Sequence, residues 1–147
     1  RMKVSEWLAR HEGAIVTVRW GSSLETVLEH LLAESCLRDV YVVGEDGRLV
    51  GHISRKRLAE HVLAEHRPAH TRRQLMERVA GGTASDFMNT SFAFASAEEA
   101  LDEVLHRQLE QEIEDLPVLD ATGRLLGAVN LTRVLSAFMS AEYEDTD

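Results

Sequence analysis

Apolar and polar positions along the chain predict short strands and helices in a fixed order. A β-branched run at residues 15–18 is typical of a strand. Compact apolar runs at 40–43 and 49–53, separated by an Asp-Gly turn, predict a hairpin. Between residues 18 and 40, apolar residues recur at the i, i+3, i+4, i+7 and i+8 spacing of one helical face: Leu24, Val27, Leu28, Leu31 and Leu32.

Polar residues indicate where these helices begin. Ser22 followed by Glu25 resembles a capping box at the start of the first helix. A closing helix is expected from about Ser54, with Leu58 and Val62 facing inward and Ala59 and Leu63 as further inward candidates.

The same order of elements is repeated later in the chain. Residues 39–51 match residues 115–127 at a spacing of 76, and six pairs are identical: Asp39/Asp115, Val42/Val118, Gly47/Gly123, Arg48/Arg124, Leu49/Leu125 and Gly51/Gly127. Ser96 and Glu99 repeat the capping pattern, ahead of a helix whose apolar stripe is expected to begin at Ala97. Leu24 and Ala97 are 73 residues apart, so the second copy is expected to have three extra residues after its first helix. An internal repeat predicts two copies of one supersecondary unit.

Each copy begins with a short amphipathic stretch, residues 4–9 in the first and 85–88 in the second. Trp7, Phe87 and Met88 lie in these stretches, and we expect them to fill the core between the copies or, alternatively, to contact a second protomer.

The repeat predicts an α+β fold. A single β-α-β-β-α copy would leave one face of its sheet uncovered, so we expect the two copies to pack sheet to sheet with pseudo-twofold symmetry. The expected boundaries are residues 2–65 for the first repeat, 66–83 for a linker with a short helix near Gln74–Val79, 84–141 for the second repeat and 142–147 for an acidic tail.

Charge divides unevenly between the two halves. Residues 1–80 carry 13 Lys/Arg against 11 Asp/Glu, whereas residues 81–147 carry 3 against 14. The second half is strongly acidic, which argues against a nucleic-acid-binding surface, because such a surface needs clustered cations. No apolar run approaches the roughly 20 residues of a membrane helix, so a soluble, cytoplasmic module is expected. Cys36 is the single cysteine and is interpreted as a buried small hydrophobe.

With both copies laid out, the chain resembles a tandem pair of cystathionine-β-synthase (CBS) domains, often called a Bateman module. The residues that carry the resemblance are 42–51 with Ile53–Ser54, and Leu116–Asp120 with 123–127. The likeness extends from about residue 2 to residue 140. It implies a regulatory module and no enzyme, binding AMP, ADP, ATP or S-adenosylmethionine in clefts between the copies. It also implies a homodimer that adjusts an enzyme, channel or membrane transporter, without inserting into the membrane itself.

The resemblance also implies where a ligand binds. The family motif Gly–x–apolar–Ser/Thr–x–x–Asp corresponds here to residues 51–57 and 127–133, in which Ser54 and Asn130 take the polar position. Both ribose-binding aspartates of the family are replaced, by Arg57 and Arg133. The candidate ligand-binding residues are Val18, Tyr41, His52, Ser54, Arg57, Pro117, Asn130 and Arg133.

The two arginines leave alternatives open. An anion at the helix starts would offset the unfavourable placement of cations there, which favours a phosphate-bearing ligand. Alternatively, the arginines face solvent or pair with carboxylates of the other copy, and the chain is a structural dimerisation module without a ligand.

Two weaker signals concern metals. The acidic segment from Glu98 to Asp115, opposed only by Arg107, is typical of a solvated face but would also fit a divalent-cation sensor. His61, His66 and His70 form a weak candidate metal cluster, since Pro68 interrupts their helix. No nucleophile–base pair or phosphate-binding glycine loop is evident, so no catalytic residue is assigned.

Overall fold

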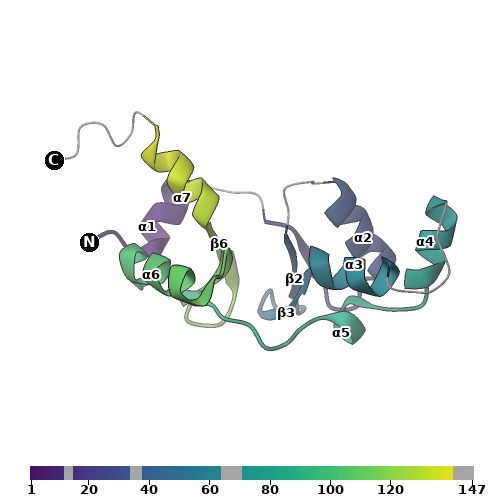
Figure 1. Ribbon diagram of the computed structural model, residues 1–147. Helices are drawn as coiled ribbons and strands as arrows, with labels where there is room; N and C mark the ends of the chain where they lie inside the picture. The colour runs from purple at the N-terminus through teal and green to yellow at the C-terminus, as the bar shows by residue number, and fades with distance from the viewer. Residues whose placement is uncertain (12–14, 34–37, 64–70, 141–147) are drawn as a thin grey trace. The chain divides into compact units, whose positions relative to one another are not determined.

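The computed structural model describes residues 1–11, 15–33, 38–63 and 71–140 (Figure 1). Within these residues, helices accompany two three-stranded sheets, with strand orders β1-β2-β3 and β4-β5-β6. This confirms the α+β class. The chain divides into two compact units: the β4–β6 unit, made of residues 1–14 and 93–147, and the β1–β3 unit, made of residues 15–92.

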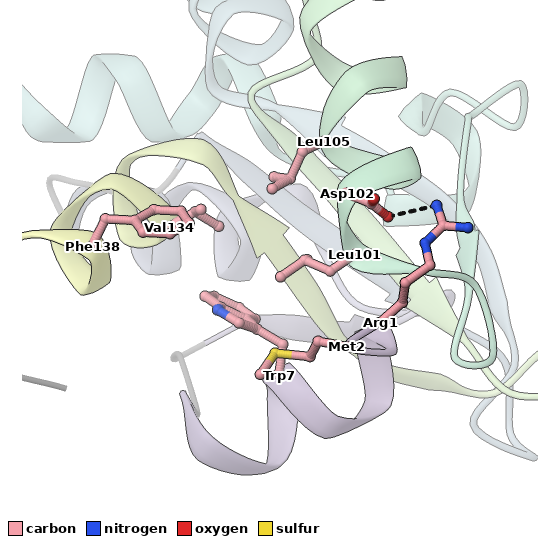
Figure 2. A pocket seen from close by; sticks show the side chains of 8 residues that line it. All are labelled: Arg1, Met2, Trp7, Leu101, Asp102, Leu105, Val134 and Phe138. Atoms are coloured by element: carbon pink, nitrogen blue, oxygen red, sulfur yellow. Dashed lines mark hydrogen bonds and ion pairs between the residues drawn. The ribbon is translucent and has the colours of Figure 1, made fainter. Parts of the chain in front are cut away.

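The β4–β6 unit combines both ends of the described chain. Its elements are α1 (Val4–Arg10), β4 (Ala95–Ser96), α6 (Leu101–Gln111), β5 (Asp115–Leu119), β6 (Leu125–Asn130) and α7 (Leu131–Phe138). β4 pairs in parallel with β5, which pairs antiparallel with β6. Trp7 of α1 is fully buried in one cluster with Leu101, Val104 and Val134, beside α6 and α7 (Figure 2).

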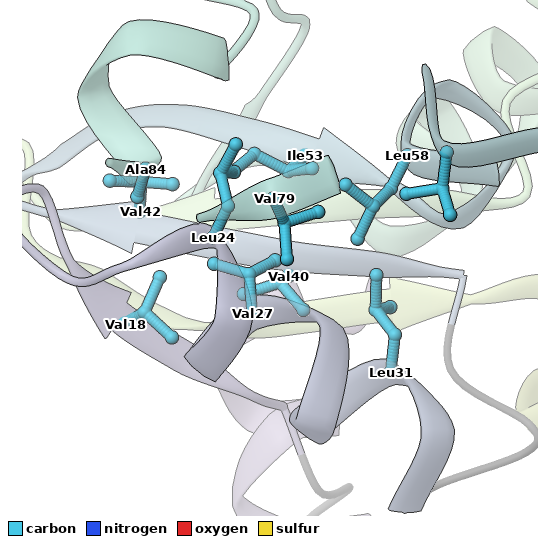
Figure 3. Packing of buried hydrophobic residues seen from close by; sticks show 11 residues of the cluster. Val18, Leu24, Val27, Leu31, Val40, Val42, Ile53, Leu58, Val79 and Ala84 are labelled. Carbon is cyan, nitrogen blue, oxygen red and sulfur yellow. The ribbon is translucent and has the colours of Figure 1, made fainter. Parts of the chain in front are cut away.

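The β1–β3 unit has the same topology with an additional helix. Its elements are β1 (Thr17–Arg19), α2 (Leu24–Ala33), β2 (Asp39–Val43), β3 (Leu49–Ser54), α3 (Arg55–Leu63), α4 (Arg72–Val79) and α5 (Ala84–Phe87). Val18, Val40, Val42 and Ile53 form one buried face of the sheet, on which α2 and α3 place Leu24, Val27, Leu31 and Leu58 (Figure 3). Burying each such side chain stabilises the fold by about 1.5–3 kcal/mol.

The hairpin turns explain one of the identical residue pairs. Gly47 and Gly123 have φ of 83° and 89°, a left-handed conformation that other residues adopt only at a cost. Asp46 and Asp120 accept backbone hydrogen bonds from Arg48 and Arg124 within the same turns, at 3.1 and 3.0 Å. The repeated turn glycine is therefore a requirement of backbone geometry.

The short helix that begins each repeat packs on the sheet of the other repeat. α1 precedes the first repeat but lies in the β4–β6 unit, where Val4 N donates to Glu99 O at 2.9 Å. α5 precedes the second repeat but lies in the β1–β3 unit, where Ala84 N donates to Ser22 O at 2.7 Å. The predicted boundaries at 65 and 84 thus follow the sequence repeat, whereas the compact units exchange these helices. Trp7 packs within one unit, and Phe87 and Met88 pack within the other.

The predicted register of the first helix pair is wrong. α2 begins at Leu24 and α6 at Leu101, 77 positions apart, so the second copy has one residue fewer before its hairpin and not three more. Ser96 does not cap α6, because its backbone N–H donates to Glu99 Oε2 at 2.7 Å a turn before the helix begins after Ala100. In the first copy the cap is Ser23, whose Oγ accepts from Thr26 N at 3.1 Å.

Candidate ligand site

Each half of the predicted site lies within one unit. In the β1–β3 unit, Tyr41 of β2 pairs with His52 of β3, and Asp39 pairs with Ser54. Because strand residues alternate between faces, these four residues share the face opposite Val40, Val42 and the helices. Val18 does not join them, since its side chain belongs to the buried cluster on the helix side.

His52 is held from two directions. Its Nδ1 lies 2.9 Å from Asp39 Oδ1, with both side chains mostly buried. Its backbone exchanges two hydrogen bonds with Asn89, at 3.0 and 2.8 Å, so residue 89 extends the edge of β3. The ring of Phe92 approaches the imidazole edge-on, with centroids 6.3 Å apart. His52 therefore fastens the segment after α5 to the sheet.

Ser54 and Arg57 form the start of α3. Ser54 Oγ accepts a hydrogen bond from Arg57 N at 3.0 Å, which is the expected N-cap. The Arg57 side chain donates through Nε to Phe87 O at 3.0 Å, and its guanidinium lies 5.0 Å from the centre of the Phe87 ring. Within the described part of the chain, no carboxylate pairs with Arg57. Among the described residues, the positive charge of Arg57 at the helix start is therefore not neutralised by a carboxylate.

The other half of the site is built differently. Asn130 caps α7 by accepting from Arg133 N at 3.0 Å, and its Nδ2 donates to Asp115 Oδ1 at 2.6 Å. Its amide group is thus committed to local contacts. Pro117 is buried in β5 opposite Ala128, at the positions that Tyr41 and His52 occupy in the first repeat. Arg133 also has partners of its own.

Asp39 and Asp115 were not among the predicted site residues. Each carboxylate forms a hydrogen bond with a side chain on the next strand of its hairpin. Asp39 binds His52 in one unit, and Asp115 binds Asn130 in the other. Their signal in the sequence is the identity of the two aspartates at the start of the repeated strand. Because each aspartate orients a polar side chain on the candidate face, both belong to the site.

The acidic segment is more fully paired than its sequence indicates. Besides Arg107, which binds Glu99 at 2.8 Å, Arg1 lies 2.9 Å from Asp102 and 3.0 Å from Glu103, and Lys3 lies 2.8 Å from Glu98. The hydrogen bond from Arg107 lowers the pKa of Glu99, and that from Arg1 lowers the pKa of Asp102. Such pairing leaves these carboxylates less available to a cation.

The predicted metal sites find no support in the described residues. There, no three His, Cys, Asp or Glu side chains are grouped so that they could hold a metal ion. His61 lies beside Phe87, with ring centroids 4.8 Å apart. His66 and His70, like Cys36 and residues 142–147, lie outside the described residues.

None of the helices in the described ranges is long and apolar enough to cross a bilayer.

Known proteins resemble this chain in sequence and in fold. It is 30% identical over 153 residues to the magnesium transporter MgtE of Thermus thermophilus, covering 95% of this chain and 30% of the transporter. The crystal structure of the cytosolic domain of the Mg²⁺ channel MgtE in complex with ATP is 28% identical, with a TM-score of 0.62, over 84% of this chain and 44% of that one. The chain thus spans less than half the length of both relatives.

A further solved structure resembles this chain in its fold. The crystal structure of CBSX2 in complex with AMP has a TM-score of 0.70 at 23% identity, covering 93% of this chain and 96% of that one. The family described as the CBS domain matches residues 14–64 and 84–140, one segment for each repeat. The duplicated sequence, the two like sheets and these matches together show that the chain belongs to the CBS domain family, as a tandem pair.

Proposed function

We propose that this CBS pair is a regulatory module that binds a phosphate-bearing ligand, an adenine nucleotide or a related anion, beside Arg57. The observation that carries the proposal is the positive charge of Arg57 at the start of α3, which no described carboxylate neutralises. A guanidinium there opposes the helix dipole, and an anion bound beside it reverses that penalty.

The ligand is expected to be held mainly through its phosphates. The family's ribose-binding aspartate is absent at 57 and 133, so the usual contact with the ribose hydroxyls is lost. The ATP in the MgtE cytosolic-domain structure supports a nucleotide as the ligand class. Tyr41, His52 and Ser54 share the face that leads to Arg57 and are the neighbouring contacts we propose.

The two halves of the site are expected to contribute unequally. Asn130 is engaged by Arg133 N and Asp115, whereas Ser54 Oγ has, among the described residues, only the bond from Arg57 N. We therefore assign the stronger anion contact to Ser54 and Arg57. Asn130, Pro117 and Arg133 remain candidate contacts on the side of the second repeat.

The regulated partner is proposed to be a membrane transporter, with the CBS pair on its cytoplasmic side. Support comes from the 30% identity to the magnesium transporter, of which the matching region is a minor part. Regulation requires a ligand that binds two arrangements of the module with different affinity, because equal affinity shifts no equilibrium. A homodimer is the expected assembly.

Isothermal titration calorimetry tests the ligand. AMP, ADP, ATP and S-adenosylmethionine are titrated into the wild type and into Arg57→Gln, which keeps hydrogen-bond donors but loses the charge. We expect a phosphate-bearing ligand to bind and the substitution to weaken it about tenfold or more. Arg73→Gln is the matched control, since Arg73 is exposed and its ion pair in the described part of the chain is with Glu77 of its own helix, at 3.5 Å. Equal affinity in Arg57→Gln and the wild type would contradict the proposed site.

A structural module without a ligand is the second candidate. It is favoured by the contact of Arg57 with Phe87 O, which gives the arginine a role in packing α5 on α3. The same titrations separate the two functions, because a module without a ligand gives no heat with any of the four compounds. Sedimentation velocity then measures whether the chain alone forms a dimer.

A further inference from the structure

The β4–β6 unit contains an apolar hollow that is distinct from the candidate ligand site. It has a volume of about 280 Å³ and lies between α1, α6 and α7 (Figure 2). Its apolar lining consists of Met2, Trp7, Leu101, Leu105, Val134 and Phe138. Arg1 and Asp102 also line it and form an ion pair there, 2.9 Å apart.

The equivalent place in the β1–β3 unit is filled by a helix. By the repeat register, the lining residues of α6 and α7 correspond to Leu24, Leu28, Leu58 and Val62 of α2 and α3. The linker helix α4 contacts both α2 and α3. Its Val79 is fully buried in the same cluster, where Figure 3 shows it beside Leu24, and Leu75 and Met76 pack against the cluster.

The two repeats therefore differ in what covers their helix pair. Val62 is only 4% exposed, whereas Phe138, at the same repeat position, is 57% exposed. Among the described residues of the β4–β6 unit, no helix takes the place that α4 has in the other unit. The groove between α6 and α7 is thus a copy of a helix-binding groove whose occupant is known in the first repeat.

The charges of α2, α4 and α6 indicate that the occupant is basic. α4 carries three arginines and one glutamate, and it packs on α2, which carries two glutamates and no Lys or Arg. Arg72 reaches Glu29 of α2 at 3.4 Å, and Arg78 donates to Val62 O at the end of α3. α6 carries three carboxylates and one arginine, so it has the same net charge as α2. The Arg1–Asp102 pair shows that a guanidinium binds at this rim.

We propose that the groove between α6 and α7 binds a short, basic, amphipathic helix of a partner protein. The apolar stripe of that helix would rest on Leu101, Leu105 and Phe138, as that of α4 rests on the first repeat. Its basic residues would replace Arg1 as the partners of Asp102 and Glu103 at the rim. Helix-in-groove recognition of this kind needs anchors spaced three and four residues apart, which α4 has in Leu75, Met76 and Val79.

The probe for this groove is a capped peptide with the sequence of residues 71–80, which includes α4 and its Thr71–Gln74 capping box. It is titrated into the isotopically labelled 147-residue chain and followed by ¹H–¹⁵N NMR. The expected result is saturable shifts at Leu101, Leu105 and Phe138. A peptide in which Asp replaces Leu75 and Met76 is expected to give none, because it lacks the apolar stripe.

Matched variants of the chain locate the binding surface. Phe138→Asp is expected to weaken peptide binding about tenfold or more, since it places a charge on a contact that would be buried. Leu32→Asp, an equally exposed leucine on α2, is expected to leave binding unchanged. Asp102→Lys is expected to weaken binding and to reduce its dependence on salt. Unchanged melting temperatures of these exposed-site variants confirm that the fold is intact.

Three results would overturn the proposal. The first is an absence of shifts in the groove at peptide concentrations up to the solubility limit. The second is shifts confined to the β1–β3 unit, which would mean that the peptide only displaces α4. The third is a shift of the groove signals with protein concentration alone, which would mean that a second copy of the chain occupies the groove.

Discussion

Arg57 donates a hydrogen bond to the backbone carbonyl of Phe87, at 3.0 Å, while its guanidinium lies 5.0 Å from the centre of the Phe87 ring. Arg57 belongs to the closing helix of the first repeat, and Phe87 belongs to the short helix that opens the second. The arginine that replaces the family's aspartate therefore fastens α5 to α3.

The first prediction concerns this contact. A double-mutant cycle with Arg57→Gln and Phe87→Leu should give a coupling free energy of about 0.5–1 kcal/mol, the size of an exposed cation–π pair. The backbone carbonyl of residue 87 is kept in both variants, so the coupling reports the ring contact alone. Urea unfolding measures each variant. Strictly additive effects would show that the ring contributes nothing beyond its burial.

Much of the fold follows from local patterns in the sequence. The hairpins, the closing helices and the linker helix lie where their apolar spacing predicts, because each depends on residues within one turn or one strand pair. The exchange of α1 and α5 does not follow, since Val4 and Ala84 would bury equally well on either sheet. Leu32 and Leu63 were expected to face inward with their helical stripes, but both are exposed, because the stripe that meets the sheet is narrower than the apolar pattern.

The candidate site was predictable only in part. Ser54 and Asn130 cap their helices as their residue types indicate. The roles of Asp39 and Asp115 depend on cross-strand register, which places each opposite the end of the next strand. The misplaced start of α6 has a local cause: Ser96 and Glu99 do form a hydrogen bond, but it closes a turn that precedes the helix.

Gly51 and Gly127 hold the same repeat position in different surroundings. A Cβ on Gly51 would lie 2.6 Å from Met88 Sδ and 3.0 Å from Asn89 O, whereas one on Gly127 would lie 3.2 Å from Leu8 Cδ2. We predict that Gly51→Ala destabilises the protein by about 1–3 kcal/mol, because Met88 and the backbone at 89 must move. Gly127→Ala should cost clearly less, because only a leucine side chain must shift. Thermal unfolding of the two variants makes the comparison, and equal losses would contradict it.

Gln108 stands where the first repeat has the buried Leu31. Its Nε2 donates to the carbonyls of Val129 at 3.0 Å, Ile113 at 3.2 Å and Glu114 at 3.4 Å. Gln108→Leu should therefore destabilise the protein by about 1–3 kcal/mol despite the gain in apolar character, because buried carbonyls lose their donor. Chemical denaturation measures the loss. A variant as stable as the wild type would mean that the carbonyls find other donors.

The Glu99–Arg107 pair makes stability depend on pH. The hydrogen bond from Arg107 lowers the pKa of Glu99 below 4.5 in the folded chain. A carboxylate with a depressed folded-state pKa contributes fully above its unfolded pKa, and the contribution is lost as pH falls through the folded value. Stability should thus decline below about pH 4.5, and Glu99→Gln should be less stable than the wild type at pH 7 but show a shallower decline. Parallel acid titrations of the two proteins would refute this if their slopes were the same.

Val62 and Phe138 allow the covering role of α4 to be measured. Val62 is buried where α4 packs on α3, whereas Phe138 is more than half exposed at the same position of α7. Val62→Ser should cost about 2–3 kcal/mol, because it removes buried apolar surface and places a hydroxyl beneath α4. Phe138→Ser removes a larger side chain but should cost less than about 1 kcal/mol, since most of that side chain already meets water. Calorimetric unfolding of both variants gives the two values, and the reverse order would show that a surface covers Phe138 in solution.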